Sequence, residues 1–509
     1  MGKLNIHNLR KTISYLKRNG LRETLVTIKE HLPQSTRETY RYDPLAEDVL
    51  EQQRGRYWEA PVTFSVVVPA YHTPERYYRE MIESVLAQTY PFWQLVIGDA
   101  GEDDTLERLT AAYEDKRICY HRLSANRSIA DNTNETLQWA QGDYIALLDH
   151  DDVLTPDALY EMAAAIERGG FGTEAPNTDS RSIASTACDM QESEKLPDTD
   201  QRIIAGESCD IRERGKQRGT MPQMLYSDED KCDENAVRFY ETNLKPDFNL
   251  DLLMTNNYIC HLLVMEAGLM KQLGFRAAYD GAQDHDLVLR AAACLWRIPG
   301  AILHIPRVLY HWRCHSASTA ANPESKLYAY EAGVKASQDF VDSQGWKAKV
   351  SMTQHMGFSR TEYDPPILEQ RREVGAIGGR VLGKARRIVG GMMNEAGEVQ
   401  YLGLKDGYSG YLNRAILVQQ AQALDLRCIR LGEQCRELFR ETTGLEYRED
   451  GVSGMYDWQG LPADYDYAGM GLKLGNALRK AGYVLLWDPQ MVCDLETMRH
   501  VSADVGAQR

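Results

Sequence analysis

The sequence predicts an α/β fold in which helices cover a parallel sheet, and three observations support this prediction. Short apolar runs alternate with longer segments in which apolar residues recur every three or four positions. The runs have the length of strands, and the periodic segments have the length of helices. The runs also lack a polar alternation, as strands do when helices bury both faces of a sheet. The repeated strand–helix–strand order therefore predicts βαβ units with parallel strands.

The first predicted strand covers residues 64–68, is rich in valine and ends at Pro69. Thr73-Pro74 then matches a helix cap followed by proline at the first helical position. The apolar residues after it recur at helical spacing. Three further strands are expected, each after a helical segment, at 94–97, 118–120 and 144–148. Ligands bind at the carboxyl ends of such strands, so the loops after the first, second and fourth strands are the expected site.

Length and composition exclude several classes of protein. At roughly 150 residues per domain, 509 residues predict about two to four domains. A hydrophobic content of 43% argues against a mainly disordered chain, and a net charge of −16 argues against a nucleic-acid partner. The sequence has no apolar window long enough for a transmembrane helix, no apolar signal segment at its start, and no CxxC pair among ten cysteines. We therefore expect a cytoplasmic protein with reduced thiols.

Charge is concentrated at the beginning of the chain. Residues 1–32 carry seven basic and two acidic residues, with apolar residues at helical spacing. Residues 1–61 are therefore interpreted as basic amphipathic helices and a linker. Two interpretations stay open: the helices pack on the neighbouring domain, or they lie on the inner face of the membrane and contact anionic lipid. Residues 62–345 are predicted to form one domain, interrupted at 169–222 by a polar, disordered insertion.

The strongest chemical signal is Leu148-Asp149-His150-Asp151-Asp152, where an apolar strand ends in three carboxylates. Asp149 and Asp151 are two positions apart, so in extended backbone they point to the same side. Mg²⁺ and Mn²⁺ prefer oxygen ligands and take one or two carboxylates together with substrate phosphates. Because clustered carboxylates repel one another, folding alone explains them poorly, and the alternative is a solvated acidic loop.

Two other acidic segments have simpler explanations. Ser227-Asp228-Glu229-Asp230 could compete as a metal site, but it is interpreted as a surface turn or acceptor region because a long insertion precedes it. Asp284 and Asp286 precede an apolar helical run. Free amides and the helix dipole explain one carboxylate at a helix start. The other is a candidate general base for an acceptor hydroxyl.

The segment 310–318 gathers two histidines, an arginine and two aromatic residues. Arg313 is suited to bidentate contact with phosphate, and His315 is suited to phosphate or metal. A single histidine in isolation would more often be structural. Because His315 lies close in sequence to an arginine and two aromatic residues, a functional role is favoured for it.

Residues 62–320 resemble an inverting family 2 glycosyltransferase with the A-type fold. The matching pieces, in order, are VVVPAY at 66–71, ESVLAQTY at 83–90, LDHDD at 148–152, QDHD at 283–286 and the segment 313–318. The resemblance implies a Rossmann-like mixed sheet flanked by helices. It also implies a divalent cation (Mn²⁺ or Mg²⁺), a nucleotide-diphosphate sugar donor and a glycan or lipid-linked acceptor.

The resemblance also implies a role for each candidate residue. Asp284 falls on the catalytic base of the family. Asp151 and Asp149 fall on its metal motif, with Asp149 also near the ribose, and His315 falls on a histidine that holds diphosphate or metal. The residues expected to contact the nucleotide sugar are Pro69, Ala70, Tyr71, Asp99, Asp149 and Arg313.

Two positions depart from the family pattern. Gly98 stands where the first of two adjacent acidic residues is usual, immediately before Asp99. Gln283 stands where a glutamate usually precedes the base. The first departure weakens any inference about the nucleotide, whereas the second leaves Asp284 in place.

The expected function is metal-dependent transfer of a sugar to a hydroxyl of a growing cell-surface glycan or lipid-linked acceptor. A single in-line displacement would invert the configuration at the anomeric carbon. One alternative is a catalytically reduced glycan-binding or scaffold subunit, which would be marked by loss of Asp151 or Asp284. A nucleotidyltransferase is the other alternative, but it needs a Gly-rich phosphate loop, and residues 69–73 contain no glycine.

Residues 346–509 are expected to form a C-terminal α/β domain. Asp464-Tyr465-Asp466 echoes Asp284-His285-Asp286, and in both places an apolar helix and a β-like run ending at proline follow. The region contains no Asp-x-Asp after an apolar strand. We therefore interpret it as a degenerate glycosyltransferase half with a structural or acceptor-facing role, the alternative being a second active centre.

Overall fold

The computed structural model describes residues 40–170, 221–315, 327–462 and 464–497, and five single positions before residue 40. The helices expected at 1–32 therefore fall outside the described residues, apart from those positions. So does nearly all of the insertion expected at 169–222.

The chain divides into two compact units, which we name by their main sheets. The nine-stranded unit comprises Tyr42–Phe248 and Ile259–Ala321, and the five-stranded unit includes Asn249–Tyr258 and Asn322–Arg509. The predicted domains are continuous stretches of sequence, whereas each unit combines separate segments. The two divisions therefore differ at 42–61, 249–258 and 322–345.

A buried ion pair explains why a short segment of the first half of the chain belongs to the five-stranded unit. Asp251 lies in helix α8 (Leu250–Thr255), and its Oδ1 is 2.5 Å from Nη1 of Arg371, whose side chain is fully buried. The Ser359 hydroxyl also donates to the Met254 carbonyl oxygen at 2.8 Å. Removing either charge of the pair would leave the other buried and unpaired, so these contacts hold 249–258 in its unit.

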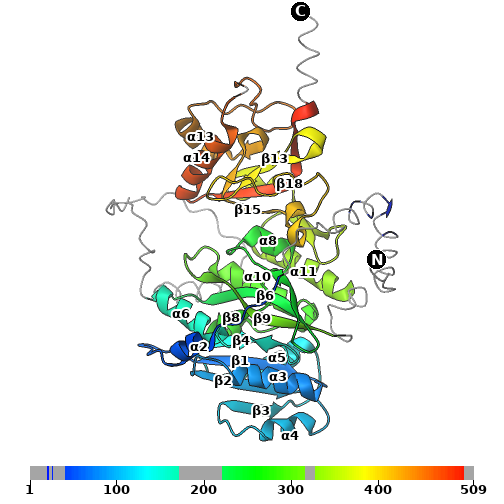
Figure 1. The fold of residues 1–509 in the computed structure, drawn as a ribbon. Helices are drawn as coiled ribbons and strands as arrows, with labels where there is room; N and C mark the ends of the chain where they lie inside the picture. The colour runs from blue at the N-terminus through cyan, green and yellow to red at the C-terminus, as the bar shows by residue number, and fades with distance from the viewer. Residues whose placement is uncertain are drawn as a thin grey trace, which may run out of the picture. The chain divides into compact units, whose positions relative to one another are not determined.

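The nine-stranded sheet has the order β3-β2-β1-β4-β8-β6-β9-β5, and β7 pairs with β6. Figure 1 labels most of these strands, from β3 at the lower edge to β6. Its strands are β1 (Phe64–Ala70), β2 (Trp93–Asp99), β3 (Ile118–Arg122), β4 (Tyr144–Leu147), β5 (Val153–Leu154), β6 (Met224–Asp233), β7 (Phe239–Asn243), β8 (Leu263–Glu266) and β9 (Ile302–Cys314). Its helices include α2 (Glu47–Arg54), α3 (Glu75–Leu86), α4 (Thr105–Ala111), α5 (Ile129–Leu137), α6 (Ala158–Gly170), α9 (Ala267–Leu273) and α10 (Gln283–Leu295).

The four strands expected from the sequence are present, and β1, β2, β3 and β4 run parallel. Val66, Val67 and Val68 of β1 have no exposed area, and α5 packs against β1 and β2. Burial of each such side chain stabilises the fold by about 1.5–3 kcal/mol. The sheet as a whole is mixed, because β8 runs antiparallel to β4 and β6. This confirms the α/β class and the mixed sheet that the family resemblance implies, whereas the local pattern alone predicts only its parallel part.

The acidic run at 227–230 is part of the sheet and not a surface turn. It lies within β6, which pairs in parallel with β9 and antiparallel with β8. Asp228, Glu229 and Asp230 are 3%, 6% and 0% exposed. The prediction of a surface turn is therefore wrong, and the physical reason is that each carboxylate has a cationic or polar partner within the protein.

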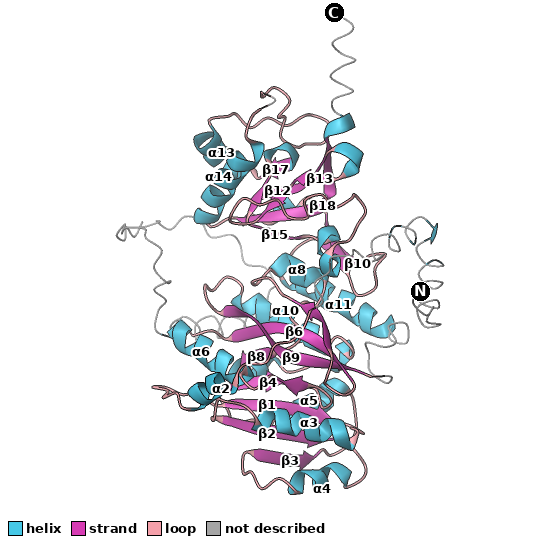
Figure 2. Ribbon diagram, in the orientation of Figure 1, coloured by secondary structure: helices cyan, strands magenta, loops and turns pink. Residues whose placement is uncertain are grey.

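The five-stranded unit contains a sheet with the order β13-β12-β18-β15, and β17 pairs with β12 (Figure 2). Its strands are β12 (Val374–Leu382), β13 (Ile388–Gly390), β15 (Gln419–Ala421), β17 (Ile429–Leu431) and β18 (Val484–Asp494). Two small ribbons join β10 (Ala348–Met352) to β11 (Ser359–Tyr363) and β14 (Met392–Met393) to β16 (Ala423–Leu424). The helices include α11 (Leu327–Ser343), α12 (Ile367–Gln370), α13 (Arg436–Thr443) and α14 (Tyr467–Lys480).

The pair β12–β18 repeats the arrangement of the pair β6–β9. Both pairs are parallel, and a helix precedes the second strand in each case, α14 before β18 and α10 before β9. Both pairings are interrupted where the second strand carries a proline, between Ile305 and Val308 and between Trp487 and Val492. The first residue that pairs again after this interruption is Asp228 in β6 and Arg380 in β12.

Candidate active site

The predicted metal motif follows β4 directly, at the carboxyl end of a buried strand. Its three carboxylates are not equally open. The side chain of Asp149 is 60% exposed and that of Asp151 is 19% exposed, while residue Asp152 is 1% exposed. Only the first two therefore remain open to a ligand.

Asp151 and His315, which are far apart in sequence, are in contact. Nε2 of His315 lies 2.8 Å from Oδ2 of Asp151, and the imidazole packs beside the Tyr77 ring at 5.2 Å. His315 immediately follows β9, which carries it to the loop after β4. The fold therefore brings together two of the three residues expected to bind a metal.

Asp152 is part of the framework of this loop. Its Oδ2 accepts a hydrogen bond from the Tyr310 hydroxyl at 2.6 Å, and its Oδ1 accepts from the Arg313 backbone N–H at 2.7 Å. Burial raises its pKa well above the usual value, and the charges of Asp151 and Asp149 add to the rise. Asp152 thus ties the loop to β9 and is not open to a ligand.

Arg313 also holds the loop from within the protein. Its side chain is fully buried, and Nε donates to the Asp151 carbonyl oxygen at 2.6 Å. Nη1 donates to the Glu234 carbonyl oxygen at 2.9 Å and lies 2.7 Å from Oε2 of Glu80. The expected contact of Arg313 with the nucleotide sugar stays a prediction that these surroundings do not favour, and a positioning role fits them better.

Asp284 and Asp286 have different surroundings, although both lie in the first turn of α10. Asp286 is 1% exposed and accepts from Nε of Arg276 and Nε of Arg290, each at 3.0 Å. Asp284 is partly exposed, and its Oδ2 lies 3.9 Å from Sγ of Cys260. Asp286 therefore secures the helix start, which leaves Asp284 as the candidate base.

The residues expected at the nucleotide base lie at the carboxyl ends of β1 and β2. Ala70 pairs with Asp99 in register, and Pro69 pairs with Gly98. Asp99 is 1% exposed and accepts from the Gly101 N–H and the Tyr120 hydroxyl, both at 2.7 Å. Tyr71 is 42% exposed beside the buried Ala70. A flat open ring beside a fixed carboxylate is suited to a planar heterocycle.

The sequence did not point to His261, which lies between the two expected groups of residues. Its Nδ1 is 3.1 Å from Oε2 of Glu229, and its Nε2 is 3.9 Å from Oδ2 of Asp149. The preceding residue is Cys260, whose thiol contacts Asp284. Asp149, His261 and Asp284 therefore surround one region. A single histidine in an apolar stretch offers no spacing signal, so only the fold reveals it.

The charges in this region influence one another. Desolvation by the surrounding protein raises the pKa of Asp149. The charge of His261 opposes this rise, and the charges of Asp151 and Asp284 add to it. Because 60% of the Asp149 side chain is exposed, solvent screens these effects. In Glu229, burial opposes ionisation, but Lys245 and His261 outweigh it and hold the pKa at about 2.

The predicted cation site at Asp149, Asp151 and His315 offers partly open oxygen and nitrogen donors, which Mg²⁺ and Mn²⁺ prefer, but its ligand atoms do not all lie within 4.8 Å of one another. Among the described residues, a second group, Glu229, Cys260 and His261, does meet this limit. In the second group the Lys245 ammonium lies 3.5 Å from Glu229, and burial raises the pKa of Cys260 to about 11. A fixed cation and a protonated thiol make it the poorer metal site.

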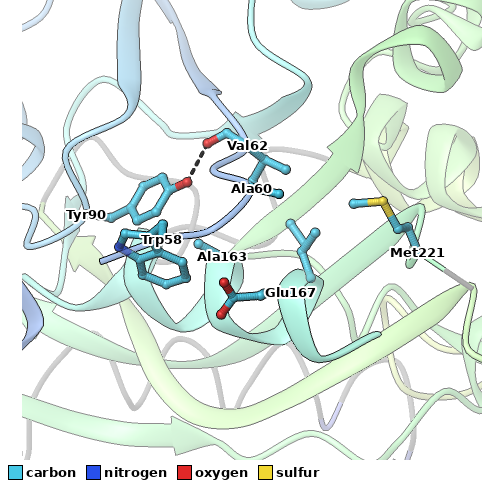
Figure 3. A pocket seen from close by; sticks show the side chains of 8 residues that line it. Trp58, Ala60, Val62, Tyr90, Ala163, Glu167 and Met221 are labelled. Atoms are coloured by element: carbon cyan, nitrogen blue, oxygen red, sulfur yellow. Dashed lines mark hydrogen bonds between the residues drawn. The ribbon is translucent and has the colours of Figure 1, made fainter. Parts of the chain in front are cut away.

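A cavity of about 180 Å³ lies elsewhere in this unit, beside the start of β1 (Figure 3). It is lined mainly by apolar side chains: Trp58, Ala60, Val62, Tyr90, Ala163, Ile166, Glu167 and Met221. The Tyr90 hydroxyl donates to the Val62 carbonyl oxygen at 2.6 Å. The candidate site residues follow the opposite ends of the strands, so we do not assign this cavity to the site.

Comparison with known proteins supports the glycosyltransferase resemblance. Residues 65–238 match the family model described as glycosyl transferase family 2. The chain is 35% identical over 280 residues to the uncharacterized protein y4gI of Sinorhizobium fredii, covering 54% of this chain and 25% of that protein. It is 30% identical over 291 residues to the O-antigen biosynthesis protein RfbC of Myxococcus xanthus, covering 56% and 18%. The chain thus spans a quarter or less of these relatives.

Among solved structures, the chain is similar to residues 1–349 of S. aureus TarS in complex with UDP. The sequence identity is 16% and the TM-score is 0.35, over 54% of this chain and 65% of that one. The family match covers β1 to β6 and includes the Asp149–Asp152 motif. The match to this family model therefore supports a family 2 glycosyltransferase domain at residues 65–238.

Proposed function

We propose that the chain transfers a sugar from a nucleoside-diphosphate sugar to a hydroxyl group of a cell-surface polysaccharide or its lipid-linked precursor, with inversion. The observation that best supports this proposal is the arrangement of four residues around one region at the carboxyl end of β4: Asp149, Asp151, His315 and Asp284. Polysaccharide assembly is supported by the names of two relatives, RfbC in O-antigen biosynthesis and ExoO of Rhizobium meliloti in succinoglycan biosynthesis.

Asp284 is the proposed general base. Its carboxylate would accept the proton of the acceptor hydroxyl as that oxygen attacks the anomeric carbon. The bond from this carbon to the diphosphate oxygen breaks on the opposite face, and the nucleoside diphosphate leaves. The attack and departure on opposite faces invert the configuration.

Asp149, Asp151 and His315 are the proposed holders of a divalent cation, Mn²⁺ or Mg²⁺. When bound, such an ion neutralises charge that develops on the leaving diphosphate. Pro69, Ala70, Tyr71 and Asp99 are proposed to receive the base of the nucleotide, with Tyr71 stacking on it. Arg313 is proposed to act by holding the Asp151 loop.

The donor screen that tests this function uses the full chain. UDP-, dTDP- and GDP-sugars are titrated by calorimetry with and without Mn²⁺, and the products of any donor that binds are identified by NMR. We expect one nucleotide to bind more tightly with Mn²⁺ and to yield a product of inverted configuration. Failure of every donor to bind would contradict the proposal.

A peripheral membrane contact through residues 1–32 is a second proposal, carried by seven basic residues against two acidic ones on apolar helical spacing. No helix of the described part of the chain is long and apolar enough to span a bilayer. Deleting 1–32 is expected to abolish cosedimentation with anionic vesicles, since each Lys or Arg near such a surface contributes about 1 kcal/mol. Equal binding of both chains, or binding to neutral vesicles alone, would contradict this role.

A further inference from the structure

Three consecutive carboxylates of β6 each hold a histidine. Oδ1 of Asp228 is 2.9 Å from Nε2 of His304, and Oδ1 of Asp230 is 2.6 Å from Nδ1 of His311. Glu229 holds His261 in the same way, at 3.1 Å. The three pairs resemble one another in chemistry and burial. Comparing the other contacts of each histidine therefore shows which pair differs from the other two.

Two of the pairs lie within the framework of the unit. His304 also contacts Asp247 at 3.3 Å and stacks on the Tyr226 ring at 5.0 Å. His311 lies between the rings of Tyr42 and Phe239, at 4.5 and 4.4 Å. In the part of the chain that the structure describes, these carboxylate and ring contacts account for the placement of both histidines.

The third pair differs because the histidine extends toward the predicted site. With Nδ1 held by Glu229, the imidazole presents Nε2 to Oδ2 of Asp149 at 3.9 Å. The ring lies flat on Tyr310, with centroids 4.6 Å apart and planes 11° apart. The hydroxyl of that same tyrosine binds Asp152. His261 is therefore oriented by the residue that also anchors the metal loop.

The backbone of His261 is held as firmly as its ring. Its N–H donates to Oε2 of Glu229 at 3.2 Å, and the fully buried Lys245 ammonium donates to its carbonyl oxygen and to that of Ile259. The same ammonium lies 3.5 Å from Glu229, whose Oε1 accepts from Asn243 at 2.9 Å. Lys245, Glu229, His261 and Asp149 thus form a chain of groups from the interior to the open carboxylate.

We propose that His261 is a positioning residue of the transfer reaction, with Glu229 and Lys245 fixing the ring so that Nε2 orients the Asp149 carboxylate toward the nucleotide sugar. The distance of 3.9 Å is longer than a hydrogen bond, and such contacts often tighten when substrate binds. A histidine fixed by a carboxylate is a common way of orienting a ligand-binding group. This role rests on the proposed function of the site.

The test compares two pairs of variants in the full chain. His261→Asn and Glu229→Gln interrupt the positioning chain, and His304→Asn and His311→Asn interrupt the two pairs within the framework. The probe is UDP with Mn²⁺, measured by calorimetry, and unfolding midpoints are measured for every chain. Transfer kinetics follow with the donor found in the screen.

The expected result is a rise of about 10- to 100-fold in the Kd of UDP–Mn²⁺ and in the KM of the donor for His261→Asn and Glu229→Gln. The double variant His261→Asn/Glu229→Gln should bind UDP–Mn²⁺ no more weakly than either single variant, because the two residues act through one group. His304→Asn and His311→Asn should lower the unfolding midpoint and leave Kd unchanged.

Unchanged affinity in a folded His261→Asn chain would overturn the positioning role, as would an equal loss in both pairs of variants. Failure of the wild-type chain to bind any nucleotide in the donor screen would overturn the proposed function itself. The two failures are distinguishable, because the first is seen only in variants and the second is seen in the wild type.

Discussion

At the residue scale, the surroundings of each carboxylate separate structure from chemistry. Asp152 and Asp286 are almost fully buried and are satisfied by protein donors, whereas Asp149 and Asp284 keep open surface. Sequence spacing could not make this distinction, because the carboxylates of each pair lie within three positions of one another. The decisive information is which strand or helix supplies the donors.

The first prediction concerns Asp284. Asp284→Asn should lower the rate of transfer by at least about 10²-fold, since the amide cannot accept the proton of the acceptor hydroxyl. The Kd of the nucleotide should stay within about twofold, because the substitution leaves the groups expected to bind it. The rate is measured from product formation and the Kd by calorimetry. Turnover close to wild type would assign the base to another residue.

Glu229 allows a prediction about pH. Its folded pKa of about 2 lies below the ordinary value of 4.5, so its charge stabilises the fold above pH 4.5 and this contribution is lost as pH falls toward 2. Glu229→Gln should therefore destabilise the chain at pH 7 by about 3–5 kcal/mol, the cost of leaving buried Lys245 without its anion. The gap between variant and wild type should narrow below pH 4.5.

Unfolding midpoints of both chains between pH 3 and pH 7 provide the measurement. Other carboxylates protonate over the same range, but they do so in both chains and cancel in the difference. A gap that is independent of pH would show that the carboxylate is not ionised in the folded protein.

At the scale of elements, the strand β6 shows where sequence reasoning reached its limit. Its acidic run follows a long polar segment and lacks the apolar pattern of a buried strand, so a surface turn was the simpler interpretation. The strand is buried because Lys245, His261, His304 and His311 come from other parts of the chain to pair with it. Pairing over such separations leaves no local pattern.

The packing of β2 against α5 gives a physical reason for the departure at Gly98. A Cβ atom added there would overlap the Thr136 side chain of α5. The acidic residue usual in the family at this position therefore has no room here, whatever nucleotide is bound.

Gly98→Ala should accordingly destabilise the nine-stranded unit by about 1–3 kcal/mol, as overpacking does in a filled core. Thr136→Ala in the same chain should restore part of the loss by removing the overlapping atoms. Gly55→Ala is the matched control, because a Cβ there meets only ordinary contacts at 3.5 Å or more. Chemical unfolding measures all four chains, and equal midpoints for Gly98→Ala and wild type would refute the steric explanation.

At the scale of the whole molecule, the first four strands and the motif after β4 could be predicted because they depend on local pattern and on loop position. The contact of His315 with Asp151 was expected only from the family resemblance. Two features could not be predicted, the inclusion of 249–258 in the five-stranded unit and the chain from Lys245 to Asp149. Each depends on residues that come together only through the sheet order, which periodicity does not encode.

The likeness between β12–β18 and β6–β9 supports the interpretation of the C-terminal region as a degenerate half. It also shows what has changed, since Arg380 follows the interruption in β12 where β6 has the acidic Asp228. The acidic segment 464–466, which is similar to 284–286 in sequence, has a local explanation as well. Asp466 caps α14 by accepting from the Gly469 N–H at 2.8 Å, and Asp464 is exposed. Neither carboxylate of this run therefore needs a catalytic explanation.

Asp464→Asn should therefore change neither the rate of transfer nor the unfolding midpoint. Asp466→Ala should lower the stability of the five-stranded unit by about 1 kcal/mol through loss of the helix cap, again without changing the rate. Product formation and thermal unfolding distinguish these outcomes, with Asp284→Asn as the inactive reference. A loss of transfer in Asp464→Asn comparable to that reference would place a catalytic carboxylate in the repeat, and the half would then be a working site.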